Sequence, residues 1–178
     1  MPPPVFTIRA ATIIPALLVA HVTTARADEP RAQIQADLGL SVICVGYEHP
    51  VAQRVTVFAG AGIFGTYFLP WFDRGDETIG GVGDVRVTWF PRDDDGRGLY
   101  ITPYARAGYT AGDDEDTGVH GGGVAITGGV FVGYAFRLSS RLDLRAGAGG
   151  QYIYIGGDNG VEASTPFVAL DITLGFRL

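Results

Sequence analysis

The feature that most constrains the fold is a period-two alternation of apolar and polar residues, which recurs along most of the chain. In one segment Leu142, Leu144 and Ala146 alternate with Asp143 and Arg145. Because successive side chains of a β-strand point to opposite faces, such a segment predicts a strand with one apolar and one polar face. The segments with this pattern are 34–44, 54–68, 79–90, 99–109, 124–136, 142–154 and 168–178. The chain is therefore expected to be all-β.

Charged residues fall on only one of the two predicted faces. Every charge within these segments lies on the polar face, namely Asp37, Arg54, Asp84, Arg86, Arg106, Asp143, Arg145, Asp171 and Arg177. A charge on the lipid-facing side of a membrane barrel costs about 2–4 kcal/mol at the bilayer midplane, so a charge-free face suits contact with lipid. The composition agrees, because charged residues make up 18% of the chain and mean hydropathy is +0.20, whereas soluble domains carry about a quarter charged residues.

The sequence excludes a spanning helix and leaves two kinds of β-structure. No stretch of about 18 uninterrupted apolar residues occurs, and a transmembrane helix needs one. A soluble sandwich or lipocalin-like barrel would show the same alternation with its faces reversed. The polar face, however, is rich in glycine rather than Lys, Glu and Thr, as at Gly60, Gly108 and Gly133. Small residues and ions of both signs suit the crowded interior of a barrel of about eight strands.

We therefore predict an antiparallel, up-and-down transmembrane β-barrel over residues 28–178. The segments of about 11–16 residues exceed the roughly 9–11 that a tilted strand needs to span a bilayer. Aromatic residues gather near strand ends, as interfacial girdles do: Tyr67, Phe68, Trp71, Trp89, Phe90, Tyr134, Phe136, Tyr152, Tyr154 and Phe176. Bacterial single-chain barrels have even strand numbers, so eight strands are expected, with residues 30–48 divided into two short strands near 39–41.

Residues 1–27 are interpreted as a secretory signal peptide. Arg9 gives a positive start, residues 10–20 are a short apolar run, and Ala25-Arg26-Ala27 matches the small-x-small cleavage pattern before Asp28. The chain carries 13 basic and 19 acidic residues, and two of the basic ones lie in this segment. A chain this acidic is not expected to bind nucleic acid. Its single cysteine permits no internal disulfide.

Three short stretches resemble the small outer-membrane β-barrel families of the OmpA, OmpX and opacity-protein type. These are Tyr47-Glu48, residues 133–138 (GYAFRL) and residues 174–178 (LGFRL). The resemblance covers about residues 30–178 and implies a monomer in the outer membrane of a Gram-negative cell, in contact with lipid and lipopolysaccharide. It also implies a last strand read by the barrel-assembly machinery, through Phe176 and Leu178. The family usually ends in an aromatic residue, whereas this sequence ends in leucine.

The candidate functional residues are the charges expected inside the barrel: Asp84, Arg86, Arg106, Asp143, Arg145 and Asp171. We expect them to form an ion-pair network that fills the lumen, because an unpaired buried charge is costly and a barrel of about eight strands is usually filled. The alternative is a narrow ion path or gate.

Catalytic, metal and cofactor sites are not expected. His49, beside Pro50 in a predicted turn, and His120, in a glycine-rich loop, lack the nearby serine of barrel lipid-modifying enzymes. The acidic runs 93–95 and 113–116 lack the spacing of a dedicated Ca²⁺ loop, and Cys44 is interpreted as a lipid-facing hydrophobe. The favoured function is a non-enzymatic structural, envelope or surface-interaction barrel. The alternatives are a channel of the OmpW kind for small or hydrophobic solutes and, less favoured, a lipid-modifying enzyme.

Overall fold

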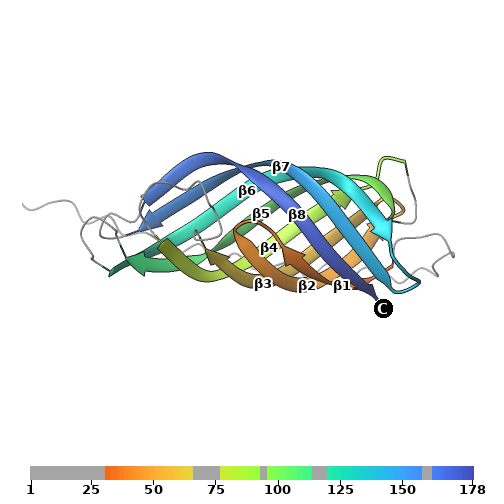
Figure 1. The fold of residues 1–178 in the computed structure, drawn as a ribbon, viewed down its shortest axis with the longest axis horizontal. Helices are drawn as coiled ribbons and strands as arrows, with labels where there is room; N and C mark the ends of the chain where they lie inside the picture. Colours follow the sequence, from red (N-terminus) through yellow and green to blue (C-terminus); the bar gives the residue numbers. More distant parts are fainter. Residues whose placement is uncertain (1–30, 66–76, 93–95, 114–119, 158–161) are drawn as a thin grey trace, which may run out of the picture.

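The structure is a computed structural model that describes residues 31–65, 77–92, 96–113, 120–157 and 162–178. It consists of strands (Figure 1), namely β1 Gln33–Leu38, β2 Val42–Ala52, β3 Val55–Gly65, β4 Glu77–Trp89, β5 Gly98–Asp113, β6 His120–Arg137, β7 Leu142–Gly157 and β8 Glu162–Arg177. None of the described residues belongs to a helix long and apolar enough to cross a membrane. The proposed signal segment, residues 1–27, lies outside the described residues.

The eight strands form a closed, all-antiparallel, up-and-down barrel. Each strand pairs with its neighbours in sequence, and β1 closes the barrel against β8. The predicted all-β, antiparallel up-and-down barrel and the predicted number of strands are confirmed. The eighth strand arises where expected, because residues 39–41 turn the chain between β1 and β2, with the Gly39 N–H donating to the Val42 carbonyl over 2.9 Å.

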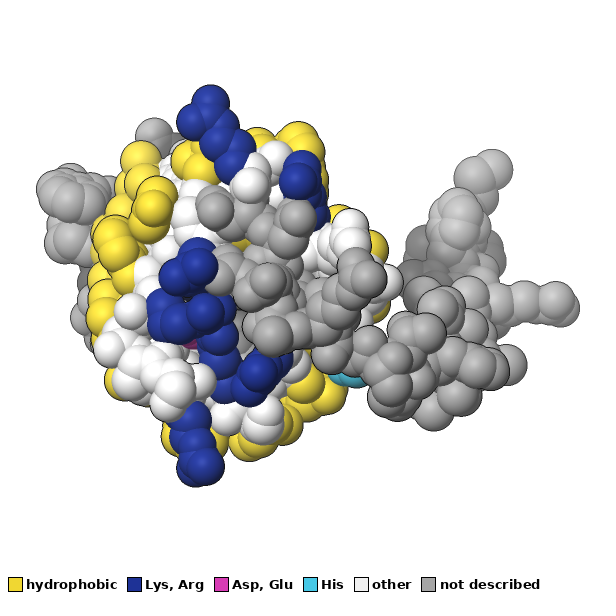
Figure 2. Space-filling model, turned by 90° about the vertical axis from the view of Figure 1, so that its right-hand side faces the viewer, with side chains coloured by type: hydrophobic (Ala, Val, Ile, Leu, Met, Phe, Trp, Pro, Cys, Tyr) yellow, Lys and Arg dark blue, Asp and Glu magenta, His cyan; other side chains and the backbone are white. Residues whose placement is uncertain are grey.

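The two faces of the wall differ as the alternation predicts. The inner face carries buried charged and polar side chains, and the outer face carries exposed apolar ones. Viewed onto the end that holds the carboxyl terminus, hydrophobic side chains line the rim and basic side chains gather within it (Figure 2). The outward aromatic residues form two groups: Tyr47, Trp89, Tyr134, Phe136 and Phe176 near this end, and Tyr109, Tyr152 and Tyr154 near the opposite one.

The prediction that Cys44 faces lipid is wrong. Cys44 is buried in the lumen with 1% of its surface exposed, as is Val42, whereas Ile43 and Val45 face outward. The turn at 39–41 reverses the parity of the alternation, so an apparently continuous apolar set from residue 34 to residue 44 is divided between two faces.

Strand lengths are uneven around the barrel, so that among the described residues one edge of β8 is partly without a strand partner. β5 to β8 have 16–18 residues and β1 has six. β8 pairs with β7 from Glu162 to Phe176, yet it pairs with β1 only over residues 173–177. In Figure 1 the short β1–β2 hairpin lies beside β8 near the carboxyl-terminal end.

Candidate functional site

All six predicted lumen charges lie inside the barrel, each at most 5% exposed. Asp84 and Arg86 come from β4, Arg106 from β5, Asp143 and Arg145 from β7, and Asp171 from β8. Each sits at an inward position of its strand because the period of two places residues i and i+2 on the same face.

Arg86 and Arg106 share the carboxylates of Asp37 and Asp84 in the middle of the lumen. We call these four residues, together with Asp171, the central cluster. Arg86 Nη2 donates to Asp84 Oδ2 over 2.5 Å and also pairs with Asp37. Arg106 donates to the same two oxygens, from Nε to Asp84 over 3.0 Å and from Nη2 to Asp37 over 3.1 Å. The nearest oxygen of Asp171 lies 3.6 Å from Arg86 Nη1. The cluster joins strands that are not neighbours, since β1 and β8 here face β4 and β5 across the lumen.

Two further ion pairs lie apart from the central cluster. Arg145 binds Glu48 in a bidentate manner, with both N–O distances 2.6 Å, and Gln33 donates to the same carboxylate over 2.7 Å. Asp143 accepts from Arg177 Nε over 2.5 Å. The structure therefore distributes the six predicted residues over three sets of ion pairs.

Aromatic rings cover the faces of the buried guanidinium groups. Arg86 lies 4.9 Å from the centroid of Phe58, Arg106 lies 4.5 Å from that of Tyr104, and Arg145 lies 5.3 Å from that of Phe90. A guanidinium can donate hydrogen bonds along its edge and stack on a ring through its face. Protein groups thus take the place of water both along the edge and over the face of each guanidinium group.

Lumen glycines make room for large inward side chains. A Cβ added to Gly133 or Gly147 would lie 2.5 Å from the hydroxyl of Tyr100. That hydroxyl donates to Asp171 over 2.6 Å, and Thr173 donates to the other oxygen of the same carboxylate over 2.7 Å. The glycine-rich face predicted for the lumen therefore serves to admit Tyr100 to the ion-pair network.

Sequence reasoning placed Asp37 and Arg177 on the polar face but omitted them from the candidate set, and it missed Glu48 as a lumen residue. The signal for Glu48 is present: once the chain turns at 39–41, the outward positions Ile43, Val45 and Tyr47 imply that Glu48 points inward.

The histidines lie away from this network. His49 lies within β2 rather than in the predicted turn, and its Nδ1 is 3.2 Å from the hydroxyl of Tyr47. His120 begins β6 rather than lying in a loop, and its Nδ1 is 2.8 Å from Asp113 Oδ1. The acidic run 93–95 and residues 114–116 fall outside the described residues. In the part of the chain that the structure describes, no group of three or more His, Cys, Asp or Glu side chains is arranged to hold a metal ion.

Buried apolar side chains fill the lumen around the ion pairs in two groups. One group is Phe90, Tyr100, Tyr104, Phe131, Ala135 and Ala169, and its rings cover the guanidinium groups of Arg106 and Arg145. The other group is Val42, Cys44, Phe58, Phe64, Val82, Ala125, Ile153 and Ile155, which we call the apolar chamber lining. Ion pairs and apolar side chains thus pack directly against one another inside the barrel.

The molecule is therefore a small β-barrel with an apolar outer surface and an ion-paired interior. No protein-family model matches the sequence, and no curated protein matches it. Among solved structures the chain is similar to the crystal structure of Neisserial surface protein A, with a TM-score of 0.49 and 14% sequence identity. That match covers 83% of this chain and 95% of the other. The narrower assignment to the OmpA, OmpX and opacity type stays a prediction.

Proposed function

We propose that the protein is an integral outer-membrane barrel with a structural, envelope or surface-interaction role and a lumen closed to ions. The observation that carries the proposal is the contrast between the two faces of the wall. The outer face of the described strands is apolar between the strand ends. The arginines and carboxylates of the inner face are joined in ion pairs. A bilayer stabilises the first face, and pairing offsets the desolvation of the second.

The proposed partners are outer-membrane lipid and lipopolysaccharide around the wall and the barrel-assembly machinery during biogenesis. Phe176 and Leu178, the candidate assembly signal, are 47% and 65% exposed. Their exposure leaves both side chains accessible from outside the barrel. We also propose that the barrel acts as a monomer.

Membrane fractionation and heat-modifiable gel mobility test the membrane location. We expect the protein in the outer-membrane fraction, with an unheated form that migrates differently from the heated one because the closed barrel resists detergent. Recovery of a soluble periplasmic chain without a mobility shift would contradict the proposal.

The alternative function is a channel of the OmpW kind for small or hydrophobic solutes, and its lumen would have to open because apolar side chains fill it here. Single-channel recording in planar bilayers separates the two functions. A closed lumen gives no discrete conductance steps, whereas reproducible steps would favour a channel.

We further propose that the protein is not an enzyme. His49 contacts Tyr47 and His120 contacts Asp113, both near strand ends, and neither of these two contacts is with a serine. Mass analysis of lipid A after overexpression should show an unchanged profile, and a new acylation state would contradict the proposal.

A further inference from the structure

One edge of β8 is open along residues 162–172. Among the described residues no strand pairs with this edge, because β1 ends at Leu38 and the chain turns back at 39–41. The Leu170 carbonyl oxygen lies beside the hairpin tip, 3.3 Å from where a Cβ on Gly39 would be. The wall of the barrel therefore has a seam between the hairpin tip and the open edge of β8.

Hydrogen bonds at the end of β8 show which of its backbone N–H and C=O groups point toward the open edge. The Leu178 N–H donates to Ala32 on the β1 side, and the Arg177 N–H donates to Arg141 on the β7 side. Backbone groups of successive strand residues point to opposite sides, and the β7–β8 register continues without a shift. Even-numbered residues of β8 therefore direct their N–H and C=O groups to the seam.

Three polar positions of this edge are satisfied or removed without a partner strand. The Val168 carbonyl accepts from Gln151 Nε2 over 3.0 Å, and the Pro166 carbonyl accepts from the Thr165 hydroxyl over 3.3 Å. Pro166 itself has no N–H to direct at the seam. Proline in a sheet is confined to edges and bulges, and an edge in lipid must hide its polar groups. Residues of β7 and β8 thus adapt this edge to remain open.

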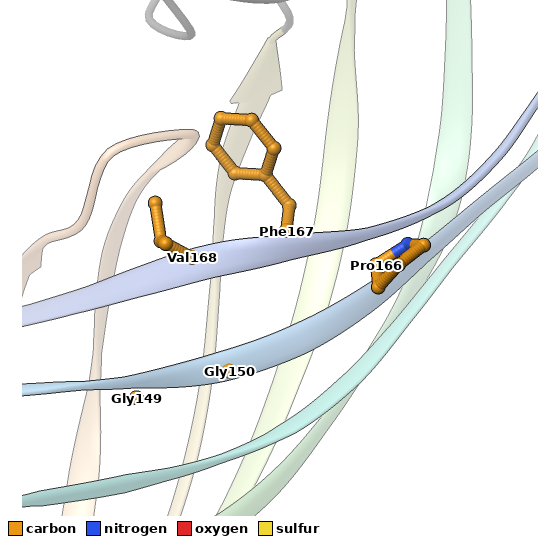
Figure 3. Close-up of a pocket in the computed structure, with 5 residues that line it drawn as sticks. All are labelled: Gly149, Gly150, Pro166, Phe167 and Val168. Carbon is orange, nitrogen blue, oxygen red and sulfur yellow. The ribbon is translucent and has the colours of Figure 1, made fainter.

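A shallow, open groove of about 620 Å³ lies against β7 and β8 beside the seam (Figure 3). Its lining is Gly149, Gly150, Pro166, Phe167 and Val168. Figure 3 shows the side chains of Phe167 and Val168 rising from β8 on the side away from the two glycines of β7. No charged residue contributes to this lining.

Phe167 links the groove to the interior. It is half-buried and packs against the apolar chamber lining, as does Leu40 from the hairpin tip. The two residues flank the seam from opposite sides, one on the open edge of β8 and one on the β1–β2 turn. The groove consequently has an apolar floor.

We propose that this groove binds one acyl chain of a membrane lipid, which enters from the bilayer and lies along the seam. The inference rests on the proposed membrane location, because the groove is continuous with the apolar outer surface that the bilayer would cover. An acyl chain fits the uncharged lining. At the adjoining end of the same strands, Tyr152 Oη and Ser164 Oγ form a polar pair 2.7 Å apart. That pair suits the ester and headgroup level of the same lipid.

Two outward glycines provide a matched test. A Cβ added to Gly150, in the groove, or to Gly81, on β4 away from the seam, meets no atom within 4 Å, so the wall accommodates a side chain at either position. Gly150→Trp fills the groove, and Gly81→Trp places the same ring elsewhere on the outer face. Each protein is inserted into dimyristoyl phosphatidylcholine vesicles, transferred to a mild detergent and examined by native mass spectrometry.

We expect the unmodified protein and Gly81→Trp each to retain one phospholipid molecule. The phospholipid occupancy of Gly150→Trp should be at least tenfold lower. Equal occupancy in all three proteins, retention by none, or retention of added free myristate but not phospholipid would each overturn the proposal. Gel mobility confirms that each variant is folded. If Gly150→Trp does not fold, the pair Gly150→Leu and Gly81→Leu gives the same comparison. Failure to insert into vesicles would overturn the proposed function too, whereas insertion without a retained lipid overturns the acyl-chain site alone.

Discussion

Arg86 is the residue on which the central cluster depends most directly, because it pairs with Asp37 and Asp84 and lies near Asp171. Replacing it with methionine leaves buried carboxylates short of a counter-charge, and breaking a buried pair in this way costs about 3–5 kcal/mol. We expect Arg86→Met to lower the free energy of unfolding by this amount, measured by urea titration in phosphatidylcholine vesicles.

Arg141→Met is the control for that substitution. Arg141 is exposed in the β6–β7 turn, and surface substitutions usually change stability by less than about 0.5 kcal/mol. Matching unfolding midpoints for Arg86→Met and Arg141→Met would show that the central cluster contributes nothing to stability.

The Glu48–Arg145 pair should behave as a coupled unit, because its bidentate contact is buried. Glu48→Gln and Arg145→Met are each expected to destabilise the barrel, and the double variant should be less harmful than the two losses added together. Residues in direct contact show interaction energies of about 0.5–3 kcal/mol. Urea titration of the four proteins measures the coupling, and additivity within about 0.5 kcal/mol would contradict a direct energetic link.

For single residues, the sequence predicts on which face of its strand a charged side chain lies, but not with which opposite charge it pairs. Period two alone places Asp84, Arg86 and Asp171 inward. Their partners depend on how strands distant in sequence face one another across the lumen, and no local pattern encodes that arrangement. Asp37 was omitted from the candidate set for this reason, whereas Glu48 was missed because the turn at 39–41 was not used to assign its face.

Among the elements, β2 shows where the alternation loses information. Both its faces are apolar near the turn, since Val42 and Cys44 line the lumen while Ile43 and Val45 face outward. Alternation identifies the buried face only when the other face is polar. The break at 39–41 was predictable from the even strand number, but residues 42–45 alone do not give the direction of Cys44, which follows only from Glu48 farther along the same face.

Two prolines in the wall are expected to respond differently to the same substitution. The β4–β5 register is interrupted between Arg86↔Tyr104 and Trp89↔Ile101, and Pro103, which cannot donate to the ladder, lies in that interval. Pro103→Val restores a donor between two strands, so we expect stability to stay equal or rise by about 0.5–1.5 kcal/mol. Pro166→Val adds a donor at the open edge of β8, so we expect stability to fall.

Thermal or urea unfolding in one lipid composition measures both variants. Equal shifts of the same sign would mean that neither proline is placed according to the pairing of its strand edge.

For the whole molecule, the sequence predicted a closed barrel because alternation, charge placement and strand length all favour it. The apolar packing inside the lumen was not predictable. Ile153 and Ile155 point inward, but they alternate with the outward Tyr152 and Tyr154, so that stretch is apolar on both faces. The apolar chamber lining becomes visible only when the register brings such inward residues together from several strands.

The filled lumen makes a prediction about conduction. The rings of Tyr104 and Phe131 stack beside Arg106 of the central cluster with their centroids 4.4 Å apart, and Tyr100 is fully buried. These rings fill the space that ions would need, so the unmodified barrel should give no discrete steps in planar bilayers. Truncating all three, as Tyr100→Ala, Tyr104→Ala and Phe131→Ala together, removes the rings from the lumen and should produce measurable steps.

The matched control truncates outward rings: Tyr134→Ala, Tyr152→Ala and Tyr154→Ala together. It removes a similar aromatic volume from the outer face and leaves the lumen filled, so it should give no conductance steps. Both triple variants must first show heat-modifiable mobility, which establishes that each is a folded barrel. Steps in the control alone, or in both variants alike, would mean that leakage reflects a weakened wall rather than an opened lumen. If the variant that lacks the three inner rings is folded but gives no conductance steps, the ion pairs of the central cluster close the barrel without these rings.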